Sequence, residues 1–399
     1  MQSTTGKGEI ENMLNIQKFI IANGLQAAID KWFLKVNETE HYCQLNYDQI
    51  ESPKGIPECD ECRGLILDKA DWSLVCQPFL RFYNEHEGHS AKIDPAKGLL
   101  LEKLDGSLIS VWFDKYQGKH VCSTRGRIFA DGEVGNAAKK AFGGEAKTFA
   151  DLFWGVVNDR YRVFMDTLRS LARNGFDSTT YMFELIGPEN RILTKYETAD
   201  MYLLGRRIRD NNGEFVESDF RHLKDVARIL GLKLPKVYSF NTREDITRIF
   251  EDLNPTDEGF VMVDYTESVN GNFRRCKIKN PRYLALSRAL HAGEGELMDT
   301  KAIVNLIRVG ETDEVIAYFP EFKDKILALK DKFDKLSLQV DADFAEIRGL
   351  EVRKDYALAA QKKSVPNALY ALRDGTVKTG AEYLKNMREE TLLDILNRG

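Results

Sequence analysis

The feature of this 399-residue sequence that most constrains its fold is a change of pattern at about residue 283. Before that point, short apolar runs alternate with Gly, Pro, Asp and Asn, which is typical of strands joined by turns. After it no convincing strand remains, and apolar residues recur at helical spacing in five segments, namely 297–308, 312–336, 341–361, 366–373 and 380–398. The sequence therefore predicts an α+β region followed by a separate helical domain.

Within the first region the patterns predict a set of strands and helices. We expect strands at 65–67, 99–101, 108–113, 120–123, 180–186, 201–205, 259–263 and 273–279, with a hairpin tip at Gln117-Gly118. We expect helices at 9–36, broken near Asn23-Gly24, at 145–174, ended by Asn174-Gly175, and at 217–230 and 242–252. In the helical domain, Thr379 followed by Glu382 indicates a capping box at the start of the last helix.

Composition and charge exclude several classes of protein. Hydrophobic residues make up 43% of the chain and charged residues 30%, as in ordinary globular proteins. The apolar runs are far shorter than the ~20 residues that cross a bilayer, and residues 1–7 lack a signal-peptide core, so we expect a cytoplasmic protein with no membrane contact. A net charge of −5 argues against coating of nucleic acid through bulk positive charge, so any such contact would be local.

The six cysteines do not suggest a disulfide framework in a long chain without a secretory signal. Cys59-Asp60-Glu61-Cys62, flanked by Cys43 and Cys76, could hold zinc, but the second cysteine runs directly into a predicted strand. We expect buried, reduced thiols.

The segment Lys103-Leu104-Asp105-Gly106-Ser107 offers a nucleophilic amine two residues before a carboxylate, in a stretch that must bend. Alone this pattern is weak, since it recurs by chance, usually as an exposed turn. A lysine nucleophile must be neutral near pH 7.5 although its ordinary pKa is ~10.4, and nearby cations or a bound divalent metal would lower that pKa. Lys277 and Lys279, alternate residues of a predicted strand, could bring two ammonium groups to one pocket and neutralise a phosphate. The alternative is an edge strand protected by lysines.

Two further carboxylates stand in positions that suit ligand binding. Glu184 lies in an otherwise apolar strand, where it needs a specific partner such as a buried arginine, a ribose hydroxyl or a hydrated metal. Glu258 follows the turn 254–257, where acidic residues are common and usually inert. Together with Asp105 they would make three carboxylates for a hard cation that bridges phosphate oxygens.

Three arginine segments look suited to anions. They are Glu61-Cys62-Arg63-Gly64, Arg81-Phe82-Tyr83-Asn84 and Arg125-Gly126-Arg127. Each could be a surface ion-pair partner, but as a set around Lys103 they suit a triphosphate or a terminal phosphate.

In their order along the chain, these motifs resemble those of the phage type 1 ATP-dependent RNA ligases that repair cleaved tRNA, members of the covalent nucleotidyltransferase superfamily. The resemblance rests on the Lys103 segment and the Arg63 and Arg81 segments above, on Phe183-Glu184-Leu185-Ile186-Gly187-Pro188, Asn190-Arg191-Ile192, Glu258-Gly259-Phe260-Val261, and Lys277-Ile278-Lys279 with Tyr283. It implies a ligase-type nucleotidyltransferase fold, with ATP-grasp-like antiparallel sheets flanked by helices. It also implies an adenylyltransferase domain at 1–287, with N-terminal elements at 1–95, and an all-helical RNA-specificity domain at 288–399.

The same resemblance implies roles for individual residues. Lys103 would form a lysyl-AMP intermediate with ATP, assisted by Lys277 and Lys279, before AMP passes to an RNA 5′-phosphate and a 3′-hydroxyl displaces it. Nucleotide binding would involve Arg63, Arg81, Asp105, Gly106, Arg125, Glu184, Glu258, Lys277, Lys279 and Tyr283. Asp105, Glu184 and Glu258 would hold Mg²⁺, or Mn²⁺, through water. Where the family can carry lysine, this chain has Arg81 and Arg125, which keep the charge but change its geometry.

The implied substrate is RNA with 5′-phosphate and 3′-hydroxyl ends, in particular a nicked tRNA anticodon loop, bound by a monomer in the host cytoplasm. Two alternatives stay open at this stage. One is a DNA ligase or capping-type nucleotidyltransferase, although no OB-like run of short strands follows Lys279. The other is a non-catalytic RNA-binding protein on a ligase fold.

Overall fold

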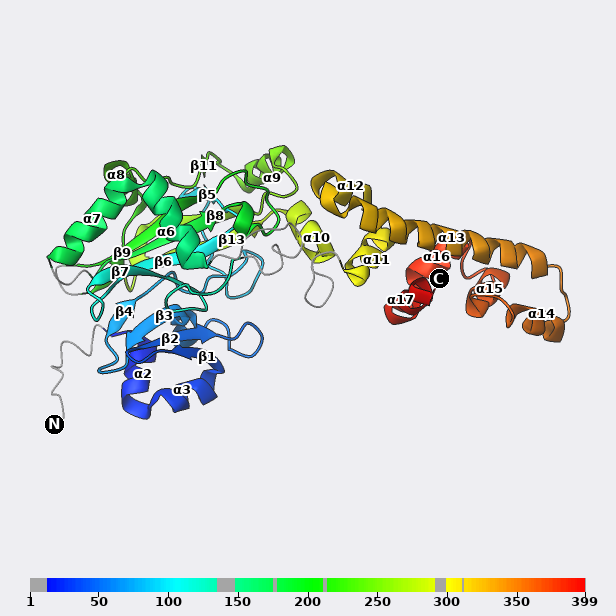
Figure 1. The fold of residues 1–399 in the computed structure, drawn as a ribbon, viewed down its shortest axis with the longest axis horizontal. Helices are drawn as coiled ribbons and strands as arrows, with labels where there is room; N and C mark the ends of the chain where they lie inside the picture. The colour runs from blue at the N-terminus through cyan, green and yellow to red at the C-terminus, as the bar shows by residue number, and fades with distance from the viewer. Residues whose placement is uncertain are drawn as a thin grey trace. The chain divides into compact units, whose positions relative to one another are not determined.

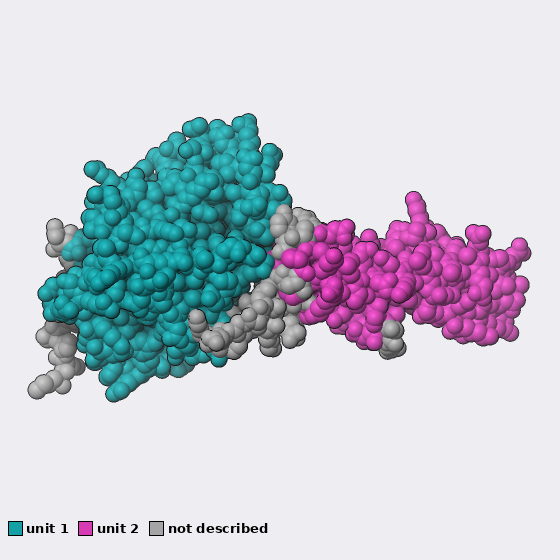
Figure 2. All heavy atoms as spheres, turned by 45° about the horizontal axis from the view of Figure 1, so that its top comes forward, with its two compact units in different colours: residues 1–283 teal, residues 284–399 magenta. Residues whose placement is uncertain are grey.

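The structure is a computed structural model that describes residues 13–134, 148–174, 178–210, 214–290, 299–310 and 312–398. The chain divides into two compact units, residues 1–283 and 284–399, which are coloured separately in Figure 2. The first unit contains three antiparallel sheets with flanking helices, and the second is all helical in its described residues, as Figure 1 shows. The predicted fold class, α+β with an all-α C-terminal region, is confirmed.

The N-terminal sheet has the order β1-β2-β3-β4. It contains β1 Leu34–Glu38, β2 Tyr42–Tyr47, β3 Arg63–Asp68 and β4 Leu74–Cys76, with α4 Pro57–Glu61 before β3. Two helices, α2 Asn15–Asn23 and α3 Leu25–Trp32, pack against it through a shared apolar core that includes Ile16, Trp32 and Leu65. The predicted break at Gly24 is confirmed, because this residue has a φ of 87° between the two helices, whereas residues 9–12 lie outside the described residues.

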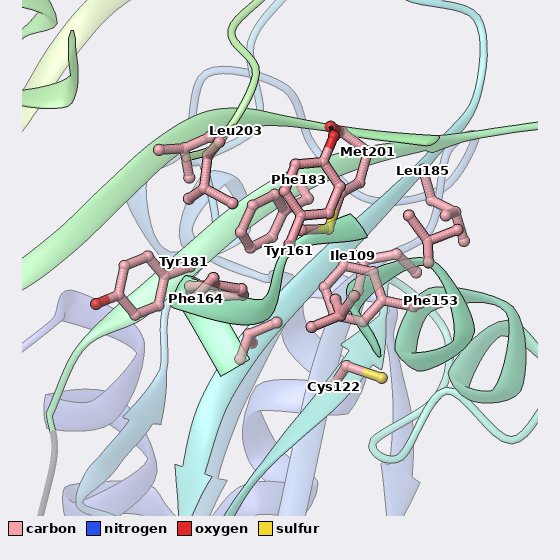
Figure 3. Packing of buried hydrophobic residues seen from close by; sticks show 14 of the residues in the cluster. Ile109, Cys122, Phe153, Tyr161, Phe164, Tyr181, Phe183, Leu185, Met201 and Leu203 are labelled. Atoms are coloured by element: carbon pink, nitrogen blue, oxygen red, sulfur yellow. Dashed lines mark hydrogen bonds between the residues drawn. The ribbon is translucent and has the colours of Figure 1, made fainter. Parts of the chain in front are cut away.

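The central sheet has the order β10-β9-β8-β6-β7. Its strands are β6 Ser107–Asp114, β7 Lys119–Thr124, β8 Thr180–Ile186, β9 Asp200–Arg209 and β10 Phe215–Glu217, and a short 3-10 helix, η1 Pro188–Asn190, follows β8. Three helices pack against this sheet, namely α6 Phe149–Arg160, α7 Arg162–Arg173 and α8 Phe220–Leu230. Figure 3 shows the aromatic centre of this core, where the Phe153 and Phe164 rings lie 5.5 and 5.4 Å from the ring of Phe183.

The third sheet, here called the lysine sheet because it carries Lys277 and Lys279, has the order β11-β5-β12-β13. It contains β5 Gly98–Glu102, β11 Val237–Tyr238, β12 Gly259–Val269 and β13 Asn272–Lys279. Helix α9 Arg243–Asp252 packs on it through Ile246, Ile249 and Phe250. After β13 the chain enters α10 Pro281–Leu290, a helix that the sequence analysis did not identify.

After α10, the described residues of the second unit form eight further helical segments. They are α11 Thr300–Val309, α12 Thr312–Tyr318, η2 Pro320–Phe322, α13 Lys323–Ile347, α14 Arg353–Ala360, α15 Pro366–Arg373, α16 Gly380–Asn386 and α17 Glu389–Arg398. An apolar core that includes Val340, Tyr356 and Leu369 holds α13, α14 and α15 together.

Several predicted boundaries are wrong for identifiable reasons. The predicted helix at 145–174 is two helices that meet at Tyr161, whose ψ of 51° breaks the helical path; residues 145–147 and Gly175 lie outside the described residues. The predicted helix at 312–336 is interrupted before Pro320, which cannot continue a helix. The capping box at Thr379 is half formed: Thr379 accepts from the Glu382 amide, but the Glu382 carboxylate accepts from the Lys378 amide instead of the Thr379 amide.

The cysteines and the helices bear on two further predictions. All six thiols are free and buried, as expected, and the described residues contain no group of three metal-ligating side chains. Within the described ranges, no helix is both long and apolar enough to span a bilayer.

Candidate active site

A cavity of about 270 Å³ lies between the lysine sheet and the central sheet. The lysine sheet contributes its face around β12 and β13, and the central sheet contributes residues of β6, β8 and β9. Seven of the predicted site residues line it, namely Arg63, Lys103, Gly106, Glu184, Glu258, Lys277 and Lys279. The prediction that the lysines and both glutamates share one pocket is confirmed.

Lys103 lies directly after β5, at the point where the chain turns toward β6. Its backbone amide donates to the carbonyl of Gly259 at 2.9 Å, which ties the turn to the start of β12. Its Nζ forms an ion pair with the carboxylate of Glu258. The sequence predicted Glu258 as a ligand of a metal in this pocket, whereas in the structure its carboxylate holds the Lys103 ammonium group directly.

Glu258 contacts two lysines at once. Besides the ion pair with Lys103, it forms an ion pair with Lys279, whose Nζ atom lies 3.2 Å from Glu258 Oε1. Because its side chain is almost fully buried, the two ammonium groups offset a charge that would otherwise be costly in the cavity. Glu258 is therefore not an inert turn residue.

Lys277 lies on the same face of β13 as Lys279, and its Nζ lies 4.9 Å from the centre of the Phe82 ring. Burial, together with the charges of Arg63, Lys103 and Lys279, lowers the pKa of this lysine to about 7. The free site thus holds a lysine that is easily deprotonated near neutral pH.

Glu184 projects from β8, opposite the lysine sheet. Burial raises its pKa to about 7, against the opposing effect of the Lys103 charge. Burial therefore raises the pKa of Glu184 and lowers the pKa of Lys277, so that both side chains change charge near neutral pH.

Arg63 opens β3 and lies 5.4 Å from the Phe82 ring on the cavity wall. Among the described residues its Nη1 atom is buried with no hydrogen-bond partner, and burial lowers the pKa of the guanidinium. A buried, unpaired guanidinium nitrogen is costly, and an anionic ligand would satisfy it.

Four predicted site residues do not line the cavity. Arg81 and Arg125 both pack on Tyr47, with their guanidinium carbons 4.0 and 4.3 Å from the ring centre. Asp105 and Tyr283 are buried and hydrogen-bonded to each other, with the Tyr283 hydroxyl 2.8 Å from Asp105 Oδ1.

The carboxylate set for a metal needs a correction. Asp105 is buried outside the cavity that Glu184 and Glu258 line, and its Oδ2 atom accepts the amides of Leu193 and Thr194, both at 2.8 Å, so the structure does not bring it together with the two glutamates. Glu184 and Glu258 remain, and two carboxylates facing a cavity fit a Mg²⁺ ion that takes its other ligands from water and phosphate oxygens.

Several cavity residues were missed by the sequence analysis. Arg275 lies two residues before Lys277 on the same face of β13, so the alternation of a strand could have found it. It forms an ion pair with Glu217 and lies 4.4 Å from the Phe79 ring. The apolar wall, formed by residues such as Leu204, Val261 and Val263, follows from the pairing of strands, which single-residue patterns do not reveal.

Comparison with known proteins agrees with this geometry. A family model described as RNA ligase matches residues 61–283, more than half of the chain. The chain belongs to this RNA ligase family. The match includes every predicted site residue, and the resemblance to the phage type 1 RNA ligases is confirmed.

Two viral relatives resemble this RNA ligase family member over most of its length. The RNA ligase of Rhodothermus phage RM378 is 25% identical over 329 residues, 72% of this chain and 72% of that protein. A protein of Autographa californica nuclear polyhedrosis virus that carries the name of a bifunctional polynucleotide kinase/RNA ligase is 29% identical over 326 residues, 79% of this chain. The chain spans only 43% of that longer relative. Among solved structures, an archaeal ATP-dependent RNA ligase aligns with a TM-score of 0.43 and 13% identity, covering 69% of this chain and 67% of that one.

Proposed function

We propose that this protein is an ATP-dependent RNA ligase that joins RNA 3′-hydroxyl and 5′-phosphate ends through lysyl-AMP and adenylylated-RNA intermediates. The observation that carries the proposal is the cavity in which Lys103 lies among Glu258, Lys279, Lys277 and Arg63. A candidate nucleophilic amine that shares one cavity with these further cations suits attack on a polyphosphate.

In the first step, the neutral amine of Lys103 attacks the α-phosphorus of ATP. A nitrogen–phosphorus bond forms, the bond from the α-phosphorus to the bridging oxygen breaks, and pyrophosphate leaves with both electrons of that bond. Lys277 and Lys279 contact the α-phosphate, and Arg63 receives the pyrophosphate end. The ion pair between Lys103 and Glu258 has to open before the attack, and the lysine proton passes to solvent or to a carboxylate of the cavity.

The rest of the nucleotide fits the remainder of the cavity. The apolar wall of Leu204, Val261 and Val263 suits a flat base, and Glu184 accepts a hydrogen bond from a ribose hydroxyl. The negative charge of bound phosphates raises the pKa of Lys277, so nucleotide binding draws a proton onto this lysine near neutral pH.

In the later steps, a 5′-phosphate oxygen of RNA displaces Lys103 from AMP, and a 3′-hydroxyl then attacks the activated 5′-phosphate and expels AMP. Glu184 and Glu258 would hold Mg²⁺ or Mn²⁺, which supplies charge neutralisation at the phosphates when bound. We place Arg81 and Arg125 at the outer end of the triphosphate, where their packing on Tyr47 orients both cations.

The proposal extends to the biological substrate. We propose that the protein repairs a nicked tRNA anticodon loop as a monomer in the host cytoplasm; the family match and the similarity to a phage RNA ligase support the RNA substrate and the viral setting. In this proposal residues 1–287 form the adenylyltransferase domain, and residues 288–399 form the helical domain that selects the RNA.

A labelling and chase experiment tests the proposal. The full-length protein is incubated with Mg²⁺ and α-labelled ATP or GTP, and then chased with 5′-phosphorylated RNA or nicked DNA. We expect an acid-labile AMP adduct that is absent in Lys103→Arg, which keeps the charge but not the nucleophile, and that is released as joined or circular RNA.

Other outcomes would overturn the proposal. Joining of nicked DNA in preference to RNA, or a GMP adduct, would indicate a DNA ligase or a capping enzyme. The absence of any adduct, together with RNA binding, would indicate a non-catalytic protein.

A further inference from the structure

Asp105 lies at the centre of a buried hydrogen-bond network, next to the turn that carries Lys103. Its carboxylate accepts three hydrogen bonds, from the Leu193 amide, the Thr194 amide and the Tyr283 hydroxyl, all at 2.8 Å. Its own amide lies 3.1 Å from the hydroxyl oxygen of Tyr196. Asp105 is only 2% exposed and does not line the cavity, so all of its contacts are made with the protein.

This network connects the turn that carries Lys103 to the first turn of α10. Tyr283 is the third residue of this helix, which begins at Pro281, two residues after the end of β13. The residue between them, Asn280, is fully buried; its amide donates to the Glu258 carbonyl at 3.0 Å, and its side chain donates to the Asp257 carbonyl at 3.0 Å. The start of α10 is thus bonded on one side to the Lys103 turn and on the other to the segment that carries Glu258.

This arrangement fixes the reacting groups relative to one another. Lys103 is two residues from Asp105, and Leu104 between them is buried. A Cβ on Gly106 would lie 2.3 Å from the Leu185 carbonyl oxygen, so the turn is also held against β8 on its other side. A shift of about 1 Å in the backbone of a nucleophile can cost on the order of a hundredfold in rate.

We propose that Asp105 and Tyr283 are positioning residues, which hold the Lys103 backbone in register with Glu258 and the end of β13 through their buried hydrogen bond, without touching the nucleotide. The inference rests on the proposed adenylylation of Lys103. It replaces the expectation that these two residues bind nucleotide and that Asp105 binds metal. It predicts that loss of the Tyr283 hydroxyl slows the chemical step and leaves nucleotide affinity nearly unchanged.

The test compares Tyr283→Phe with a matched control, Tyr161→Phe. Tyr161 is also buried in the first unit, and its hydroxyl also donates to an aspartate, Asp200, but it lies in the helix-packed core of the central sheet and not at the cavity. Single-turnover formation of the labelled adduct is measured against ATP concentration, well below the melting temperature of each variant.

We expect Tyr283→Phe to lower the maximal rate roughly 10- to 100-fold, while the ATP concentration for half-maximal rate changes less than about threefold. Tyr161→Phe should keep the wild-type rate within about twofold, even if its melting temperature falls as much as that of Tyr283→Phe. Asp105→Asn is the second variant, and Asp105→Asn/Tyr283→Phe should be no slower than the slower single variant, because both changes break one interaction.

Two outcomes would overturn the inference, and a third would overturn the proposed function on which it rests. Equal rates for Tyr283→Phe and Tyr161→Phe would overturn the inference. A higher ATP concentration for half-maximal rate in Tyr283→Phe, at an unchanged maximal rate, would also overturn it, because Tyr283 would then contact the nucleotide. If the wild-type protein forms no adduct, the proposed function itself fails.

Discussion

The carboxylate of Glu258 offsets the charge of two lysines in a site that is otherwise rich in positive charge. It binds Lys103 and Lys279 together, and without it three lysines and Arg63 would repel one another in a confined space. The same carboxylate is one of the two that fit a divalent ion, so arrival of the ion would release Lys103 from its ion pair. Glu258 therefore serves the empty and the loaded site in different ways.

Replacement of Glu258 by glutamine is expected to abolish most activity without unfolding the protein. Glutamine keeps the shape but loses the charge that places Lys103 and that suits a metal, so adduct formation should fall on the order of a hundredfold. The measurement is the single-turnover rate at saturating ATP and Mg²⁺. Wild-type rates in Glu258→Gln would contradict a role for this carboxylate.

Glu184 gives a prediction for stability as a function of pH. Its pKa is raised to about 7 by burial, so its contribution to stability is present below its ordinary pKa and is lost as the pH rises through about 7. Glu184→Gln removes that loss and should stabilise the nucleotide-free protein at pH 8 by roughly 1–2 kcal/mol, with little effect at pH 5. Denaturant unfolding at the two pH values checks this, and an equal effect at both would contradict it.

At the residue scale, the sequence identified the charged groups better than their partners. Lys103, Lys277, Lys279 and Glu184 could be named because their residue types and order suit one chemistry. The Lys103–Glu258 pair and the Asp105–Tyr283 bond could not, because they join residues more than 150 positions apart. A motif shows which groups are present, whereas only the fold decides which of them meet.

At the scale of elements, the site depends on close contact between strands at two glycines. A Cβ on Gly106 would lie 2.3 Å from the Leu185 carbonyl oxygen, and a Cβ on Gly259 would lie 2.4 Å from the Ile278 carbonyl oxygen. Gly259 also has a φ of 124°, which disfavours any side chain. These contacts set the positions at which Lys103 and Glu258 enter the cavity.

Gly106→Ala should therefore distort the start of β6. We expect a loss of about 1–3 kcal/mol in the free energy of unfolding and a severe loss of adduct formation. Gly126→Ala is the matched control, because a Cβ there meets no atom within 4 Å. If both variants behave alike, the close approach of β6 and β8 does not matter.

The sequence predicted most of the longer strands, but it predicted the ends of the long helices and the shortest strands poorly. All eight predicted strands of the first unit are present, and α15 Pro366–Arg373 has the predicted bounds. The short strands β10 and β11 were missed because two or three residues carry no periodicity, and they exist only through pairing with β9 and β5. Helix α10 was missed because strand-like residues lead directly into it.

At the scale of the whole molecule, the two units have separate apolar cores. The core around Val340 and Tyr356 lies entirely within the second unit, and all cavity residues lie in the first. Loss of stability in the second unit should therefore leave the cavity intact.

Thr379→Ala tests this independence. Thr379 accepts the Glu382 amide at 3.1 Å as the N-cap of α16, and its loss should destabilise the second unit by about 1 kcal/mol. Calorimetry should show one shifted transition, while formation of the Lys103 adduct keeps its wild-type rate. A parallel fall in adduct formation would show that the units depend on each other.

The six buried thiols have a practical consequence. Burial raises the pKa of Cys43, Cys59, Cys76 and Cys122 to about 12, and it also raises those of Cys62 and Cys276, so little thiolate is available to maleimide dyes in the folded protein. A cysteine introduced on the surface would be labelled almost alone, with all native cysteines in place. Fluorescent reporters of substrate capture could thus be attached to either unit of the otherwise unaltered chain.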